Sequence, residues 1–272
     1  MKFYEQLEKL LLTQNHKTKI VEFKSFYQKY KNGEFTFEEN YEKKLFDQPS
    51  YESFCKIVPP QDVPKRKNLT TKEGQIYLLH AIAHIEYSAI DLALDAAYRF
   101  SGLPKEYYDD WLEVADDEVN HFLMLEELLN EVGGYYGEVE VHNALFEAMQ
   151  RTSHSLLERM AVVPRYLEAN GLDATPAILR KLEKLPQSEM LGRIIKALHV
   201  IVDEEVSHVQ KGDRWFSYAC EKEGKDKEIY FEIIDRYYPL WLGKKKELNV
   251  EARKEAGFTC NELKVMANKE VC

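Results

Sequence analysis

The chain has 272 residues, of which 44% are hydrophobic and 31% are charged, so it can bury a core in one or two domains. Its 47 acidic residues outnumber its 37 basic residues and give a formal net charge of −10. This charge disfavours general nucleic-acid binding, which draws its affinity from basic side chains that displace counterions. The small numbers of Gly (12) and Pro (9) favour long helices over many short strands joined by tight turns.

Residues 1–70 are expected to form an N-terminal extension with short helices at 2–12 and 20–30 and a proline-containing connector. Apolar residues recur at helical spacing in the first of these segments, and four prolines interrupt the region that follows the second. No chemistry is assigned to residues 1–50. Two short basic runs, at residues 65–67 and 244–246, are interpreted as solvated loop charges.

From residue 71 onward, helical periodicity predicts long helices at 71–100, 104–132, 142–169 and 188–223. Helix-start residues and terminal glycines mark most of these boundaries, and Asn170 with Gly171 is expected to end the third helix. A short helix is expected between Pro176 and Pro186. Further helices are predicted near Asp226 and at Thr259, where Thr259 and Glu262 have the spacing of a capping box.

These elements predict an all-α protein, a ferritin-like four-helix bundle with additional N- and C-terminal helices. The bundle would comprise residues 71–223, and helices in residues 224–272 would pack on it. In such a bundle the second and third helices are parallel, so residues 133–141 would cross over between them. Nine extended residues span about 30 Å, which is enough for that crossing.

A repeated local motif indicates a metal site. The sequence Asp117-Glu118-Val119-Asn120-His121 lies in the second long helix, and Glu204-Glu205-Val206-Ser207-His208 lies in the fourth. A Glu and a His three residues apart share one helix face, so both can reach one metal ion. Both motifs interrupt apolar stripes, where an isolated carboxylate would cost several kcal/mol unless it were paired, neutralised or metal-bound.

The other two helices would each supply one glutamate, as in di-iron and di-manganese bundles. Glu86 lies in the middle of the apolar face of the first helix, and Glu158 is preferred in the third because it is near the helix centre. Glu147, Glu168 and His154 remain alternatives to Glu158. The predicted metal ligands are therefore Glu86, Glu118, His121, Glu158, Glu205 and His208.

Several residues are expected to support this site rather than to bind metal. Asp117 and Glu204 could orient the imidazole of the opposite motif, and His154 and Arg165 are further candidates for this role. Arg165 could instead bind an anionic substrate. His80 and His84 are expected to have packing or supporting roles, and Pro164 is expected to kink the third helix.

Four carboxylates and two imidazoles suit two iron ions, with manganese or a mixed pair as alternatives, and the lack of thiolates argues against structural zinc. The four cysteines are far apart in the sequence and none of them forms a C-x-x-C pair, so no disulfide framework is expected. No signal-peptide-like or membrane-spanning apolar run is present. A soluble cytoplasmic protein without membrane contact is expected.

The sequence also resembles a bacterial ferritin-like family of unassigned function, and the resemblance covers about residues 55–240. The matching segments are VPKR at 63–66, EG at 73–74, HAIAHIE at 80–86, AIDLALDAA at 89–97, RMAVVP at 159–164, GLD at 171–173 and RWF at 214–216. That family is similar in turn to the di-iron monooxygenase that hydroxylates the isopentenyl group of a modified tRNA adenosine. The resemblance implies a ferritin-like fold with metal ligation at the six positions, but it does not imply a specific reaction.

Three functions are compatible with these observations. The first is an oxygen-activating oxidoreductase, a hydroxylase by preference, that uses O₂ or peroxide on a small-molecule substrate and receives electrons from a donor protein. A modified tRNA is a lesser substrate alternative because of the acidic charge, and a homodimer is an open alternative. The second is a ferroxidase-like or metal-storage bundle without an organic substrate. The third is a helical interaction module that binds no metal.

Overall fold

The structure, a computed structural model, describes residues 1–239, 241 and 247–272. Within these residues it is all-helical, and the only strand-like pairings are two isolated bridges, between Lys2 and Thr36 and between Ile57 and Val141. The chain divides into two compact units, Met1–Gln150 and Arg151–Cys272. The predicted division at residues 70 and 223 stays a prediction. None of the described helices combines the length and apolar character needed to span a bilayer.

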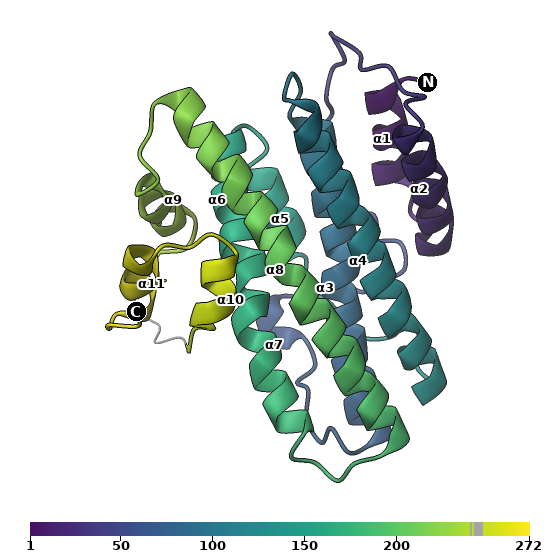
Figure 1. The fold of residues 1–272 in the computed structure, drawn as a ribbon. Coiled ribbons are helices and arrows are strands. Elements are labelled where there is room, and N and C mark those ends of the chain that lie inside the picture. Colours follow the sequence, from purple (N-terminus) through teal and green to yellow (C-terminus); the bar gives the residue numbers. More distant parts are fainter. Residues whose placement is uncertain (240, 242–246) are drawn as a thin grey trace. The chain divides into compact units, whose positions relative to one another are not determined.

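Two long helices, α3 (Lys72–Arg99) and α4 (Lys105–Val132), form the centre of the first unit. Thr71 starts α3 because its side chain accepts a hydrogen bond from the backbone N–H of Gly74. Gly133 ends α4 in the left-handed conformation, with φ 88°. A short link joins the two helices, which run side by side in close contact (Figure 1). The predicted positions of both helices are confirmed.

The N-terminal extension is ordered on these helices. Helix α1 (Phe3–Leu12) contacts α3, and α2 (His16–Lys31) contacts α4 (Figure 1). A hydrogen bond of 3.0 Å between the hydroxyls of Tyr4 and Tyr108 links α1 to α4. A short 3₁₀ helix, Pro60–Asp62, follows in the connector. Residues 65–67 are exposed, as expected of solvated loop charges, whereas the run at 244–246 lies outside the described residues.

The connection after α4 follows α3 back along its length. A Cβ atom at Gly133 would lie 2.6 Å from Nζ of Lys72, the first residue of α3. The backbone N–H of Gly137 then donates to His80, and the carbonyl of His142 contacts His84. His84 lies 12 positions after Lys72 in the helix, so this connection advances about 18 Å along α3 before α5 (Ala144–Arg151) begins. This direction agrees with the predicted crossover.

The prediction of one long third helix at residues 142–169 is wrong. The chain instead forms α5, a break at residues 152–155, α6 (Leu156–Val162), a π-helical segment η2 (Val163–Glu168) and α7 (Ala169–Leu182). Ser155 restarts the helix by accepting a hydrogen bond from the backbone N–H of Glu158. Asn170 and Gly171 do not end it, and Pro176 lies inside α7.

Helix α8 (Glu189–Glu223) is the longest element of the second unit and confirms the predicted fourth helix, with Ser188 as its N-cap and Gly224 at its end. It packs against α6, η2 and α7. At the contact with η2, a Cβ atom on Gly212 would lie 2.3 Å from Cβ of Pro164. Only glycine allows this close approach. The disturbance expected at Pro164 therefore takes the form of a π-helical segment against which α8 packs.

The C-terminal part contains α9 (Ile229–Tyr237), α10 (Val250–Glu255) and α11 (Cys260–Ala267). The predicted capping box is confirmed, because Thr259 and Glu262 exchange side-chain-to-backbone hydrogen bonds. No disulfide framework was expected from the sequence, whereas the structure contains one disulfide, between Cys260 and Cys272, with their Cα atoms 5.8 Å apart. One helix and a turn separate these cysteines, and their spacing alone does not reveal that the chain folds back.

Candidate metal centre

Glu86 of α3 and the first Glu-x-x-His motif of α4 converge inside the first unit. Nδ1 of His121 lies 3.2 Å from Oε2 of Glu86 and 3.5 Å from Oε2 of Glu118. One donor atom from each of the three residues lies within 4.8 Å of the others. The helical offset of three residues directs Glu118 and His121 to the same side of α4, and the short link between the helices brings Glu86 opposite them.

All three side chains are buried: Glu86 is 4% exposed, Glu118 0% and His121 1%. Burial alone would lower the pKa of His121, but the carboxylates of Glu118 and Glu86 raise it to about 11. The imidazole is therefore a cation that accompanies two buried carboxylates. A divalent metal ion could replace its proton, since metal-bound histidine is neutral. This Glu₂His cluster can hold a metal ion.

Aromatic side chains that follow two of these residues in sequence pack against each other. Tyr87 follows Glu86, Phe122 follows His121, and the centroids of their rings lie 5.2 Å apart. Tyr136, from the segment after α4, packs 4.9 Å from Phe122 and 5.4 Å from Tyr87. These rings join α3, α4 and the segment after α4 in one aromatic cluster.

His80 and His84 hold the segment that follows α4, which confirms their predicted packing role. Nε2 of His80 accepts hydrogen bonds from the backbone N–H groups of Gly137 and Val139. Nε2 of His84 lies 3.0 Å from the carbonyl oxygen of His142, which can only accept, so this nitrogen carries the proton. Nδ1 of His84 then accepts from the hydroxyl of Tyr136 at 3.0 Å. Burial lowers the pKa of His80 to about 4 and that of His84 to about 3.

A second buried charge cluster, which was not predicted from the sequence, lies on α3. Nζ of Lys19 lies 2.6 Å from Oδ1 of Asp91, and the hydroxyl of Ser50 donates to Oδ2 at 2.6 Å. Lys19 is 0% exposed. A signal existed, because Lys19 precedes Phe23, Phe26 and Tyr30 at helical spacing and so belongs to the buried stripe of α2. These contacts attach the N-terminal extension to the helix that carries Glu86.

The second Glu-x-x-His motif lies on α8 in the second unit. Nδ1 of His208 is 3.7 Å from Oε1 of Glu205, which is the arrangement that the three-residue spacing predicts. His208 is completely buried, and the side chain of Glu205 is 13% exposed. The motif therefore lies on the inner side of α8, as its position in the apolar stripe indicates. Its role as a metal ligand stays a prediction.

Glu158 has a different environment from the other predicted ligands. Oε1 of its carboxylate pairs with Arg236 of α9 at 2.5 Å, and Oε2 accepts from the hydroxyl of Tyr237. Nε2 of His154 lies 3.1 Å from the same Oε2. Glu158 therefore binds groups that neutralise its carboxylate. It would have to exchange these partners before it could bind a metal ion.

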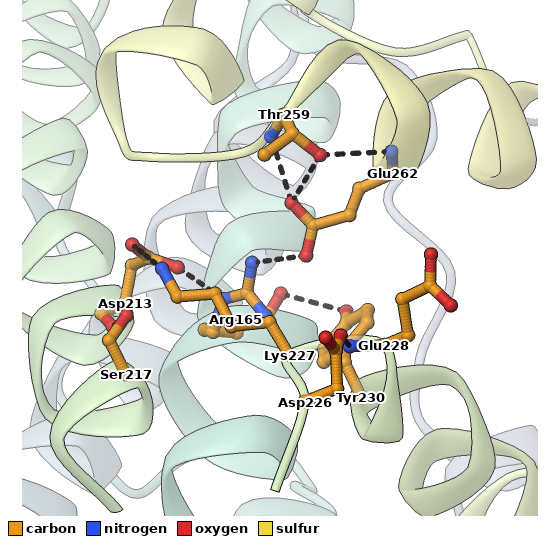
Figure 2. A network of polar contacts seen from close by, with 9 residues as sticks. All are labelled: Arg165, Asp213, Ser217, Asp226, Lys227, Glu228, Tyr230, Thr259 and Glu262. Carbon is orange, nitrogen blue, oxygen red and sulfur yellow. Dashed lines mark hydrogen bonds and ion pairs between the residues drawn. The ribbon is translucent and has the colours of Figure 1, made fainter. Parts of the chain in front are cut away.

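The other predicted supporting residues occupy varied positions. Arg165 lies in a buried network in which Nε is 2.9 Å from Oδ1 of Asp213 and Nη2 is 2.8 Å from Oε1 of Glu262 (Figure 2). It therefore pairs with carboxylates other than the predicted metal ligands. Asp117 is half-buried and Glu204 is exposed. Of the alternatives to Glu158, Glu147 is exposed and Glu168 is half-buried.

Comparison with known proteins identifies relatives but no activity. Residues 12–264 match the family described as "Protein of unknown function (DUF455)". An "Uncharacterized protein" of Haemophilus influenzae is 41% identical over 215 residues, which cover 76% of this chain and 72% of that protein. No solved structure matches the chain.

The family match corrects the expected extent of the resemblance. It begins at residue 12 rather than near residue 55, so it includes most of the N-terminal extension. Similarity to the ferritin-like superfamily and to the tRNA hydroxylase stays a prediction. Because the match covers nearly the whole chain, the protein belongs to the DUF455 family.

Proposed function

We propose that the protein is a di-metal carboxylate oxidoreductase that uses iron, with manganese or a mixed pair as alternatives. The main support for this proposal is the buried cluster of Glu86, Glu118 and His121 in the first unit. Two buried carboxylates beside one imidazole provide the donor types that iron and manganese take, and both carboxylates can bridge or chelate. The second copy of the motif, with Glu205 and His208 in contact on α8, supports the proposal.

The proposed ligand set is Glu86, Glu118, His121, Glu205 and His208, with Glu158 as the sixth member. Glu158 would join after releasing Arg236 and Tyr237. Two bound iron ions would supply reductive activation of O₂ or peroxide. The residues of the chain would bind the metal ions, and the proton of His121 would leave as metal binds.

Within this class we propose a hydroxylase acting on a small organic molecule, with electrons supplied by a donor protein. The packed N-terminal extension supports this choice over simple metal storage, because it adds aromatic walls to the helices that carry Glu86 and His121. Its His16 ring lies 5.9 Å from Phe122. A modified tRNA is a lesser alternative, since the net charge is −10. A homodimer and a cytoplasmic location complete the proposal.

The first experiment is elemental analysis of the purified protein. We expect about two iron or manganese ions per chain, and their loss in Glu118→Ala and in Glu205→Ala. Glu106→Ala is the matched control, because Glu106 is an exposed glutamate in the first turn of α4. Circular dichroism would verify that all variants are folded. Full metal content in both ligand variants would contradict the proposed site.

Oxygen consumption distinguishes the functional classes. After anaerobic loading with ferrous iron and chemical reduction, the protein should consume O₂ faster than the Glu118→Ala variant. Consumption that continues only while ferrous iron is supplied, and that yields ferric iron, would favour a ferroxidase. A protein that carries no metal and whose melting temperature does not rise with iron or manganese would favour an interaction module.

A further inference from the structure

Two of the four cysteines are exposed and bonded to each other, and the other two are buried. Cys260 and Cys272 lie at the surface, with a sequence separation of 12 and with their Cα atoms 5.8 Å apart. Cys55 is 4% exposed and Cys220 is 2% exposed. A small thiol in solution can therefore reach the exposed disulfide but not the buried thiols. Exposed disulfides are the ones that exchange readily.

The environment of Cys260 favours thiol exchange. Cys260 is the first residue of α11, where backbone N–H groups stabilise a thiolate. After α11, Asn268 adopts a left-handed conformation with φ 51°, and the last residues return toward the start of the helix. This return brings Cys272 to Cys260, so one bond attaches the C-terminal tail to the helix.

The same end of α11 is attached to α8 through buried charges. Thr259, the residue before Cys260, caps the helix and accepts from the backbone N–H of Glu262. Oε1 of Glu262 pairs with Arg165, which also pairs with Asp213 of α8 (Figure 2). A Cβ atom at Gly257 would lie 2.6 Å from Oδ2 of Asp213, so the chain before α11 passes close to α8. The disulfide is therefore next to the contact that holds α11 in the second unit.

We propose that Cys260 and Cys272 form a reversible redox site that controls how firmly α11 is held against the Arg165 network. The oxidant is a low-molecular-weight disulfide. The Cys260 thiolate attacks one of its sulfurs, forms a mixed disulfide and releases one thiolate. The Cys272 thiolate then attacks the Cys260 sulfur and releases the second. Two electrons pass from the cysteine pair to the oxidant, and the two cysteine protons end on the released thiols.

The test uses the full chain equilibrated in buffers with increasing ratios of glutathione disulfide to glutathione. Samples are quenched in acid, alkylated and analysed by mass spectrometry. We expect the Cys260–Cys272 pair to change from dithiol to disulfide across this series and back again when the ratio is reversed, while Cys55 and Cys220 remain thiols. A pair that stays in one state in all buffers would overturn the proposal.

Hydrogen exchange measures the structural consequence. Peptides covering residues 259–267 should exchange at least ~10-fold faster in the reduced protein than in the oxidised protein. Cys272→Ser should exchange at the reduced rate in every buffer, whereas the matched control Lys269→Ser should respond like the parent. Equal exchange of α11 in both states would show that the bond ties down the tail alone, which would also overturn the proposal.

Discussion

Each unit places two carboxylates beside a buried positive charge, but the group that carries this charge differs. In the first unit, Glu86 and Glu118 face the imidazole of His121, whose pKa they raise to about 11 after burial alone would lower it. In the second unit, Asp213 and Glu262 face the guanidinium of Arg165. A guanidinium keeps its charge at any ordinary pH, whereas an imidazolium can release its proton to an incoming metal ion.

This difference separates a structural network from a candidate binding site. Arg165 lies among the rings of Phe216, Tyr230 and Phe258, each with its centroid 4.6 to 4.7 Å from the guanidinium carbon. Its position is therefore set by packing as well as by charge. His121 offers a nitrogen lone pair once its proton leaves, and Arg165 offers only donors. Buried acids alone do not indicate a metal site. Whether they can bind a metal ion depends on whether their positively charged partner can give up its proton.

The largest change in stability is expected when Arg165 is replaced. Arg165→Met should lower the free energy of unfolding by about 3–5 kcal/mol, because Asp213 and Glu262 would remain buried without the guanidinium. Denaturant unfolding measures this change. Lys227→Met is the matched control, since Lys227 also contacts Asp213 at 3.6 Å but is 46% exposed, and its loss should cost less than about 1 kcal/mol. Equal effects of the two variants would contradict the structural role of Arg165.

The second prediction concerns a histidine that is kept neutral. Burial lowers the pKa of His80 to about 4 from its ordinary 6.5, so its contribution to stability is complete above pH 6.5 and is lost as the pH falls toward 4. The loss should approach about 3 kcal/mol. His80→Gln retains an acceptor for Gly137, and its unfolding free energy should fall less over this interval. Parallel pH profiles of parent and variant would show that His80 does not titrate in this way.

The third prediction concerns metal binding by the Glu86, Glu118 and His121 cluster of the first unit. Glu86→Gln should raise the dissociation constant for ferrous or manganous ion roughly 100-fold, or about 2.7 kcal/mol, because an amide oxygen is a weaker ligand than a carboxylate. Titration calorimetry under anaerobic conditions measures the constant, with Glu106→Gln as the control. Unchanged affinity would remove Glu86 from the ligand set.

The smallest effect concerns the cap beside the Arg165 network. Thr259→Ala removes the hydroxyl that caps α11 and should cost about 1 kcal/mol. Amide exchange in α11 should accelerate by about fivefold at that cost, while exchange in α3 should not change. Thr259→Ser preserves the hydroxyl and should behave like the parent. Faster exchange in the serine variant would show that the methyl group, not the cap, is responsible.

The sequence predicted the elements whose signals are local. Thr71, Ser188 and Thr259 start helices where their capping chemistry indicates, and Gly133 and Gly224 end them. The three-residue spacing of Glu118 and His121, with Glu86 in the middle of an apolar stripe, also indicated the cluster of the first unit. Each of these inferences depends on one helix, or on two helices joined by a short link.

The predictions failed where contacts between distant parts of the chain determine the local structure. Residues 142–169 were predicted as one helix, yet the break at residues 152–155 and the π-helical segment at Pro164 interrupt it, and α8 packs against that segment at Gly212. Glu158 lies mid-helix by sequence, but Arg236, 78 residues away, supplies its partner. The fold-back of Cys272 onto Cys260 likewise depends on how the chain turns after α11. The spacing of residues along one helix cannot predict these contacts.

The buried pair of Lys19 and Asp91 limits how the protein can be shortened. A chain trimmed to the helices from residue 71 onward would retain Asp91 but lose both Lys19 and Ser50, its two partners at 2.6 Å. The carboxylate would then be uncompensated on the helix that carries Glu86. Recombinant work that seeks a minimal metal-binding domain should therefore keep the N-terminus, and proteolytic removal of the first 50 residues should yield an insoluble or metal-free remainder.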